Sequence, residues 1–182
     1  MQKKGQIVEI LRQSPVFTED NSDMEDKRDQ LGLDSNLRTY SLFDGIIVGE
    51  HDGVEAYKIG QRKKLTGGGH QQALYVISID STDNRLFVGA GDDHPGLFTK
   101  VWHWYADEVV GHTAGQKYLE QEELELSVMV KLPYVEELQK AVLYKFENDL
   151  YLEFVEKQKK QSLMQHLDIY HEGILILTTK ID

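Results

Sequence analysis

The strongest constraint on the fold of this chain is a succession of short apolar segments with turn-forming residues between them. Each segment is 4 to 9 residues long and has the pattern of a strand that packs on at least one face. Strands are predicted at 5–11, 43–48, 56–59, 74–79, 85–88, 98–104, 124–132, 140–146, 150–155 and 173–177. Asp83-Asn84 and Glu147-Asn148-Asp149 have the composition of hairpin tips. Short strands at near-regular spacing favour a sandwich or a barrel, so we predict an all-β fold for most of the chain, with two small β-barrels in tandem.

Two stretches without a strand pattern divide the chain. Residues 12–42 are rich in polar and acidic residues and contain Pro15, which predicts a largely irregular acidic insertion on the surface with one short helix around 24–31. Residues 89–96 are rich in glycine and turn formers, and we place a domain boundary there. The predicted domains are residues 1–92, which include the insertion, and residues 93–182.

Composition excludes several classes of function. The chain has no cysteine, which excludes disulfides, thiolate metal sites and cysteine nucleophiles or persulfide carriers. Acidic residues outnumber basic ones by 31 to 20, and the formal charge of −11 opposes binding to a phosphate backbone unless the basic residues are concentrated in one place. No apolar run is long enough to cross a bilayer and no secretory signal is found, so we expect a cytoplasmic protein without membrane contact.

Motifs for catalysis and for cofactors are also lacking. The sequence has neither the phosphate-binding loop G-x-x-x-x-G-K-S/T nor the nucleophile elbow G-x-S-x-G, and its seven histidines form no H-E-x-x-H pair. Gly67-Gly68-Gly69 is interpreted as a hairpin loop. An enzyme that uses carboxylates such as Asp92 and Asp93 is the least favoured hypothesis, because paired acids in a glycine-rich turn are commonly turn formers. We predict no catalytic residue, no metal and no cofactor.

The segment 57–64 is the best candidate for a binding surface. It contains Lys58, Arg62, Lys63 and Lys64 without an acid, and cations presented on a loop suit contacts to phosphate. The alternative is a solvated loop whose charges balance nearby acids, and the residues themselves favour neither interpretation.

Aromatic residues elsewhere favour structural roles. Trp102 and Trp104 lie on one side of a predicted strand, where they could stack on bases, but a position in the core or between domains is favoured. His51 lies in a turn, and the favoured interpretation is that its ring hydrogen-bonds the local backbone.

A family resemblance begins in the same region. "VGEHDG" at 48–53 followed by "YKIGQRK" at 57–63 resembles the "VGEHDG…YTIGQRKGL" signature of the central domain of bacterial tRNA-specific 2-thiouridylases. The resemblance continues through "LYVI" at 74–77 to "DHP" at 93–95, and "GQIV" at 5–8 is similar to the strand that opens that domain, which makes residues 12–42 an insertion. Lys64 replaces a glycine of the signature, and the C-terminal part departs from the "GQxAVFYDGE" ending of the family.

The resemblance implies roles for the matched residues. The residues expected to contact RNA are Lys58, Gln61, Arg62, Lys63, Lys64 and His51. Those expected to be structural are Gly49, Asp52, Gly53, Gly60, Gly67, Gly68, Asp93, His94 and Pro95. By the same resemblance, residues 1–92 form a central-type barrel and residues 93–182 a C-terminal-type barrel.

In that family the barrels are joined to an ATP-pyrophosphatase domain with an "SGGVDS" loop and two catalytic cysteines, and neither feature occurs in this sequence. The resemblance therefore implies a truncated or degenerate, non-catalytic family member that binds tRNA as an accessory to a separately encoded catalytic thiouridylase domain. The alternative is a divergent stand-alone β-barrel protein that acts through protein–protein contacts without RNA binding. The basic segment 58–64 and the central-domain signature favour the tRNA-binding hypothesis, whereas the net charge and the changed C-terminal motifs favour the alternative.

Overall fold

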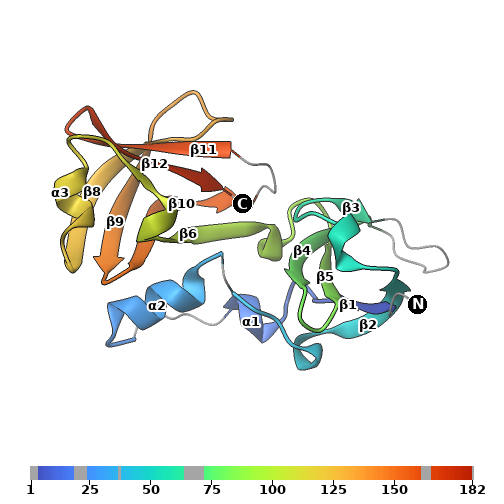
Figure 1. The fold of residues 1–182 in the computed structure, drawn as a ribbon. Helices are drawn as coiled ribbons and strands as arrows, with labels where there is room; N and C mark the ends of the chain where they lie inside the picture. The colour runs from blue at the N-terminus through green and yellow to red at the C-terminus, as the bar shows by residue number, and fades with distance from the viewer. Residues whose placement is uncertain (1–3, 19–23, 37, 64–71, 161–164, 182) are drawn as a thin grey trace. The chain divides into compact units, whose positions relative to one another are not determined.

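The computed structural model describes residues 4–18, 24–36, 38–63, 72–160 and 165–181, and it is built mainly from β-strands (Figure 1). The predicted all-β class is confirmed. Two compact units can be distinguished: the first unit comprises residues 1–20, 39–98 and 159–162, and the second comprises 21–38, 99–158 and 163–182. The predicted boundary after residue 92 lies shortly before Thr99, where the chain enters the second unit. Among the described residues, no helix is long and apolar enough to cross a membrane.

The first unit contains a five-stranded sheet in the order β2-β1-β5-β4-β3. Its strands are β1 (Gly5–Glu9), β2 (Ile46–His51), β3 (Arg62–Lys63), β4 (Leu74–Asp80) and β5 (Arg85–Ala90). β1 pairs parallel with β5, and the other described neighbours pair antiparallel. Successive β1 residues face opposite sides, so Ile7 and Val8, both fully buried, belong to two separate hydrophobic clusters. The sheet is therefore covered on both faces.

Short helices connect these strands. They are α1 (Pro15–Thr18), η1 (Leu42–Asp44), η2 (Val54–Ala56) and η3 (Pro95–Leu97). The predicted strand at 56–59 is wrong, because the chain there leaves η2 and enters a turn in which Gly60 has a φ of +81°. The hairpin predicted at Asp83-Asn84 is confirmed, and Asn84 has the left-handed φ of +53° that such turns need.

The second unit contains a seven-stranded sheet in the order β6-β10-β9-β8-β11-β12-β7. Its elements are β6 (Phe98–Tyr105), η4 (Ala106–Glu108), β7 (Val110–Gly111), α3 (Gln116–Leu119), β8 (Glu123–Lys131), β9 (Gln139–Phe146), β10 (Asp149–Lys159), β11 (Gln165–His171) and β12 (Ile174–Ile181). Trp102 and Trp104 stack with ring centroids 6.2 Å apart inside its main hydrophobic cluster. The core interpretation of this pair is confirmed.

Helix α2 (Lys27–Asp34) belongs to the second unit. The predicted short helix exists, but the description of its segment as a surface excursion is wrong. Leu31 is 1% exposed and packs with Val101, Tyr144 and Tyr151, and Ser35 forms a parallel bridge with Val101, so α2 lies against β6 (Figure 1). The sequence of α2 does not show this packing, because Leu31 is the only residue of the helix that is fully buried and no apolar face is formed.

Candidate nucleic-acid interface of the first unit

The basic segment begins with a turn whose backbone is held by hydrogen bonds. The Lys58 amide donates to Oε1 of Gln61 at 2.9 Å, and the Gln61 amide donates to the Lys58 carbonyl at 3.1 Å. Gly60 donates to the carbonyl of Val76 at 2.7 Å, and the Val76 amide donates to the Gln61 carbonyl at 3.0 Å. Gln61, expected to contact RNA, therefore closes this turn with its side-chain oxygen, and its backbone carbonyl joins the turn to β4.

The cations next to this turn are presented to solvent. Lys58 and Arg62 are exposed, and Arg62 lies on β3, an edge strand, opposite Tyr75 of β4. Among the described residues, no carboxylate lies within salt-bridge distance of Lys58 or Arg62. This disfavours a loop whose charges balance nearby acids. Lys64, Gly67 and Gly68 lie outside the described residues, as does the side chain of Lys63.

Replacing Gly60 with alanine is expected to destabilise the first unit by about 1 kcal/mol, because a φ of +81° is strained for a residue with a Cβ atom. Steric clash adds little, since the nearest atom to a new Cβ is the Lys160 carbonyl oxygen at 3.7 Å. Amide hydrogen exchange in β4 measures the loss. Gly32→Ala is the matched control, because Gly32 lies inside α2 and alanine favours helix. Equal losses in both variants would contradict the argument.

His51 lies inside the unit. It is 4% exposed, its Nδ1 accepts a hydrogen bond from the Gly53 amide at 3.1 Å, and its ring meets Tyr57 edge-on at 5.6 Å. Gly5 packs so closely that a Cβ there would lie 2.3 Å from Nε2 of His51. These contacts favour the structural interpretation of His51 and leave its ring inaccessible to a phosphate group.

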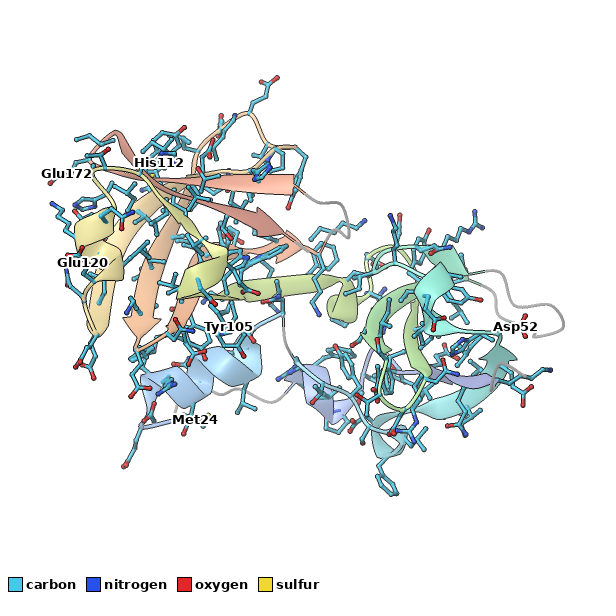
Figure 2. The ribbon with its side chains drawn as sticks, in the orientation of Figure 1. Met24, Asp52, Tyr105, His112, Glu120 and Glu172 are labelled. Atoms are coloured by element: carbon cyan, nitrogen blue, oxygen red, sulfur yellow. The ribbon has the colours of Figure 1, made fainter. Side chains whose placement is uncertain are left out.

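The other signature residues of the "VGEHDG" turn support the same geometry. Gly49 pairs with Ile7 in the β1–β2 ladder, and Gly53 is the donor to His51. Asp52 is exposed at the turn, as Figure 2 shows. The turn is thus built around the buried His51 ring.

The "DHP" motif is a second turn built around a buried histidine ring, and its Pro95 is the first residue of η3. His94 is fully buried; its Nδ1 accepts from the Gly96 amide at 3.1 Å, and Nε2 lies 3.1 Å from the carbonyl oxygen of Ile10, to which it donates as the neutral tautomer. Burial lowers the pKa of His94 to about 4, so the ring is uncharged near neutrality. The carboxylate of Asp93 accepts from Arg12, which lowers the Asp93 pKa.

Charge is divided unequally between the units. Counted from the sequence, the first unit has ten lysines and arginines against eleven acids, a formal charge of −1, and the second has ten against twenty, a formal charge of −10. The net charge of the chain therefore resides almost entirely in the second unit. The objection to phosphate binding that the total charge raises does not apply to the first unit.

Two cations of the first unit were not singled out from sequence. Arg12 follows β1, and Lys159 belongs to the run "KQKK" at 157–160, the end of which returns to the first unit. The lysine run was a visible signal, but its strand was assigned to the other predicted domain. Among the described residues, no group of three or more metal-ligating side chains is placed to hold a metal ion.

Comparison with known proteins identifies first the class of domain and then the family. The domain family described as "tRNA methyl transferase PRC-barrel domain" matches residues 37–90, which lie almost wholly in the first unit. The tRNA-specific 2-thiouridylase MnmA of Christiangramia forsetii is 33% identical over 96% of the chain, and that of Flavobacterium johnsoniae is 32% identical over 96%. The enzyme of Karelsulcia muelleri is 36% identical over 84%.

The chain thus belongs to the family of tRNA-specific 2-thiouridylases, and it matches part of their length. It spans 44% of the Christiangramia and Flavobacterium relatives and 37% of the Karelsulcia relative. The resemblance noted in the signature residues is therefore confirmed over nearly the whole chain.

Proposed function

We propose that this chain is a non-catalytic, tRNA-binding part of a 2-thiouridylase-type protein of the cytoplasm. The first unit, as the central-type barrel, provides the RNA surface through Lys58, Arg62, Lys63 and Lys64. The observation that carries the proposal is that Lys58, Arg62 and Lys63 lie on a hydrogen-bonded turn and an edge strand of a unit whose formal charge is only −1. Backbone phosphates are the chemistry that such a group recognises.

We assign a different role, the recognition of another protein domain, to the second unit. Its charge of −10 opposes contact with RNA. This charge suits contacts to protein better than contacts to RNA, so we assign to this C-terminal-type barrel the recognition of a catalytic thiouridylase domain. The second candidate function, a stand-alone protein that contacts only proteins, is favoured by the same observation and differs in predicting no tRNA binding.

Titration of the full chain with unfractionated tRNA tests the proposal. Binding is expected to weaken steeply between about 50 and 200 mM salt, because neutralised phosphates release counterions. The triple variant Arg62→Ala, Lys63→Ala, Lys64→Ala is expected to bind about tenfold more weakly at low salt and to show a shallower salt dependence.

The control is Lys117→Ala, which removes an exposed lysine from α3 in the acidic second unit. It is expected to leave the affinity unchanged. Absence of binding at about 50 mM salt would overturn the proposal and support the protein-contact function, as would equal losses in the triple variant and the control.

A further inference from the structure

Three distant parts of the first unit meet at the turn that follows β5. Gly91, with a φ of +92°, donates its amide to the Ala73 carbonyl at 2.9 Å. A Cβ at Gly91 would lie 3.1 Å from Oε1 of Gln72 and 3.2 Å from a terminal guanidinium nitrogen of Arg12. Arg12 also donates to the carbonyl of Asp93 at 3.3 Å, and Nζ of Lys159 lies 3.5 Å from the Asp92 carbonyl oxygen. Arg12 and Lys159 therefore converge on one turn.

The strand register places the basic segment at the same end of the sheet. Lys63 pairs with Leu74, and Leu74 pairs with Ala90, so the end of β3, the start of β4 and the end of β5 are neighbours. β1 runs parallel to β5, and the Ile10 amide donates to the Val88 carbonyl, so the chain reaches Arg12 at this same end. Gly60 of the basic turn lies beside the backbone of Lys160, the neighbour of Lys159 in the chain.

We infer that Arg12 and Lys159 extend the basic segment into one surface, at this end of the sheet, that binds the phosphodiester backbone of tRNA. This inference rests on the proposed function and adds two binding residues to it. The side chain of Arg12 is 46% exposed, and a guanidinium has five donors, so its contact with the Asp93 carboxylate leaves donors for a phosphate. Lys159 is exposed beside it. Contacts of this kind position a nucleic acid without selecting its sequence.

The carboxylate of Asp93 allows a test in which one substitution strengthens tRNA binding and others weaken it. It accepts a hydrogen bond from Arg12, so it competes with any phosphate for that guanidinium. Asp93→Asn removes this negative charge and keeps the side-chain shape, and it is expected to tighten tRNA binding about threefold. Arg12→Ala and Lys159→Ala are each expected to weaken binding about threefold to tenfold and to lower the salt slope by about 1, whereas Lys159→Arg retains affinity.

The experiment is a titration of unfractionated tRNA into the full-length variants, with Lys117→Ala as the control. A folding defect weakens binding, so tighter binding by Asp93→Asn cannot arise from misfolding. If the wild-type chain binds and the triple variant of the basic segment weakens that binding, but Arg12→Ala and Lys159→Ala match the wild type, this inference is overturned while the proposed function stands. Unchanged binding by Asp93→Asn also overturns it, as does weaker binding by an Asp93→Asn chain whose hydrogen exchange in β1 and β5 matches that of the wild type. Failure of the wild-type chain to bind at all is a failure of the proposed function.

Discussion

Lowering the pH from about 6.5 to about 4 is expected to destabilise the first unit by about 3 kcal/mol through His94 alone. An unfolded histidine binds a proton below its ordinary pKa, whereas the buried ring resists protonation until the pH approaches 4. Between these values the unfolded state holds more protons than the native state, so stability is complete above the window and falls as the pH decreases through it. The pKa of Asp93 is lowered, so the contribution of that carboxylate is lost only at still lower pH, below its ordinary value of 3.8.

The measurement needs a probe confined to the first unit. Both tryptophans, Trp102 and Trp104, lie in the second unit, so their fluorescence does not report on His94. Hydrogen exchange of peptides from β1 and β5, followed in denaturant from neutral pH to pH about 4.5, gives the local free energy of opening. The exchange rates observed at each pH are compared with the intrinsic rates of the unfolded chain at the same pH.

Two variants separate the titration of His94 from its packing. In His94→Asn the new side chain can still accept from the Gly96 amide, and in His94→Gln it can still donate to the Ile10 carbonyl, but neither side chain titrates. Both variants are expected to be less stable at neutral pH, by about 1 to 3 kcal/mol, because each loses one buried hydrogen bond. Both are also expected to lose the dependence on pH. An acid-induced loss in either variant as large as in the wild type would rule out His94 as its source.

Most strands could be predicted from sequence because each has enough apolar residues to show its pattern locally. β8 follows the expected alternation closely, whereas β4 and β9 are mainly apolar runs that pack on both faces. β11 was not predicted, although its buried Leu167 and Ile169 alternate with His166 and Asp168 in the pattern of a strand with one buried face. The two-residue strand β3 has no pattern of its own and exists only because β4 pairs with it.

In the candidate site, too, residues that are neighbours in sequence could be identified and residues brought together by the fold could not. The cations at 58–64 were predicted because they are adjacent in sequence. Arg12 and Lys159 meet only because β1 lies parallel to β5 and because the end of β10 returns to the first unit. The uneven division of charge was also inaccessible, since residues 21–38 precede most of the first unit in sequence and yet belong to the second.

Segment 24–38 is tied to the second unit by polar contacts as well as by Leu31. Arg28 donates to the Asp149 carboxylate at 2.6 Å, and Lys27 lies 2.9 Å from that of Glu153. Burial raises the pKa of Asp149, but hydrogen bonds from His103 and Arg28 outweigh it and hold that pKa below its ordinary value. The amide of His103 donates to the side chain of Asn36 at 2.8 Å. These ion pairs are partly exposed to solvent and are expected to contribute less than a fully buried leucine, so we expect Leu31 to supply most of the stabilisation.

Leu31→Ala is therefore expected to lower the free energy of unfolding of the second unit by about 3 kcal/mol, because it leaves a cavity among Val101, Tyr144 and Tyr151. Leu33→Ala is the matched control on the same helix: Leu33 is 49% exposed, and its replacement is expected to cost less than about 0.5 kcal/mol. Urea unfolding followed by the fluorescence of Trp102 and Trp104, which lie in the main cluster of this unit, measures both.

The result decides whether α2 is part of the cooperative fold of the second unit. If it is, the loss at Leu31 lowers the midpoint seen by the tryptophans, although neither ring belongs to the cluster that contains Leu31. If α2 instead opens alone, Leu31→Ala accelerates hydrogen exchange only within residues 27–34 and leaves the tryptophan transition where it was. That second outcome would mean that α2 packs on the second unit without taking part in its cooperative unfolding, because a helix whose buried leucine can be removed without weakening the sheet contributes nothing to its stability.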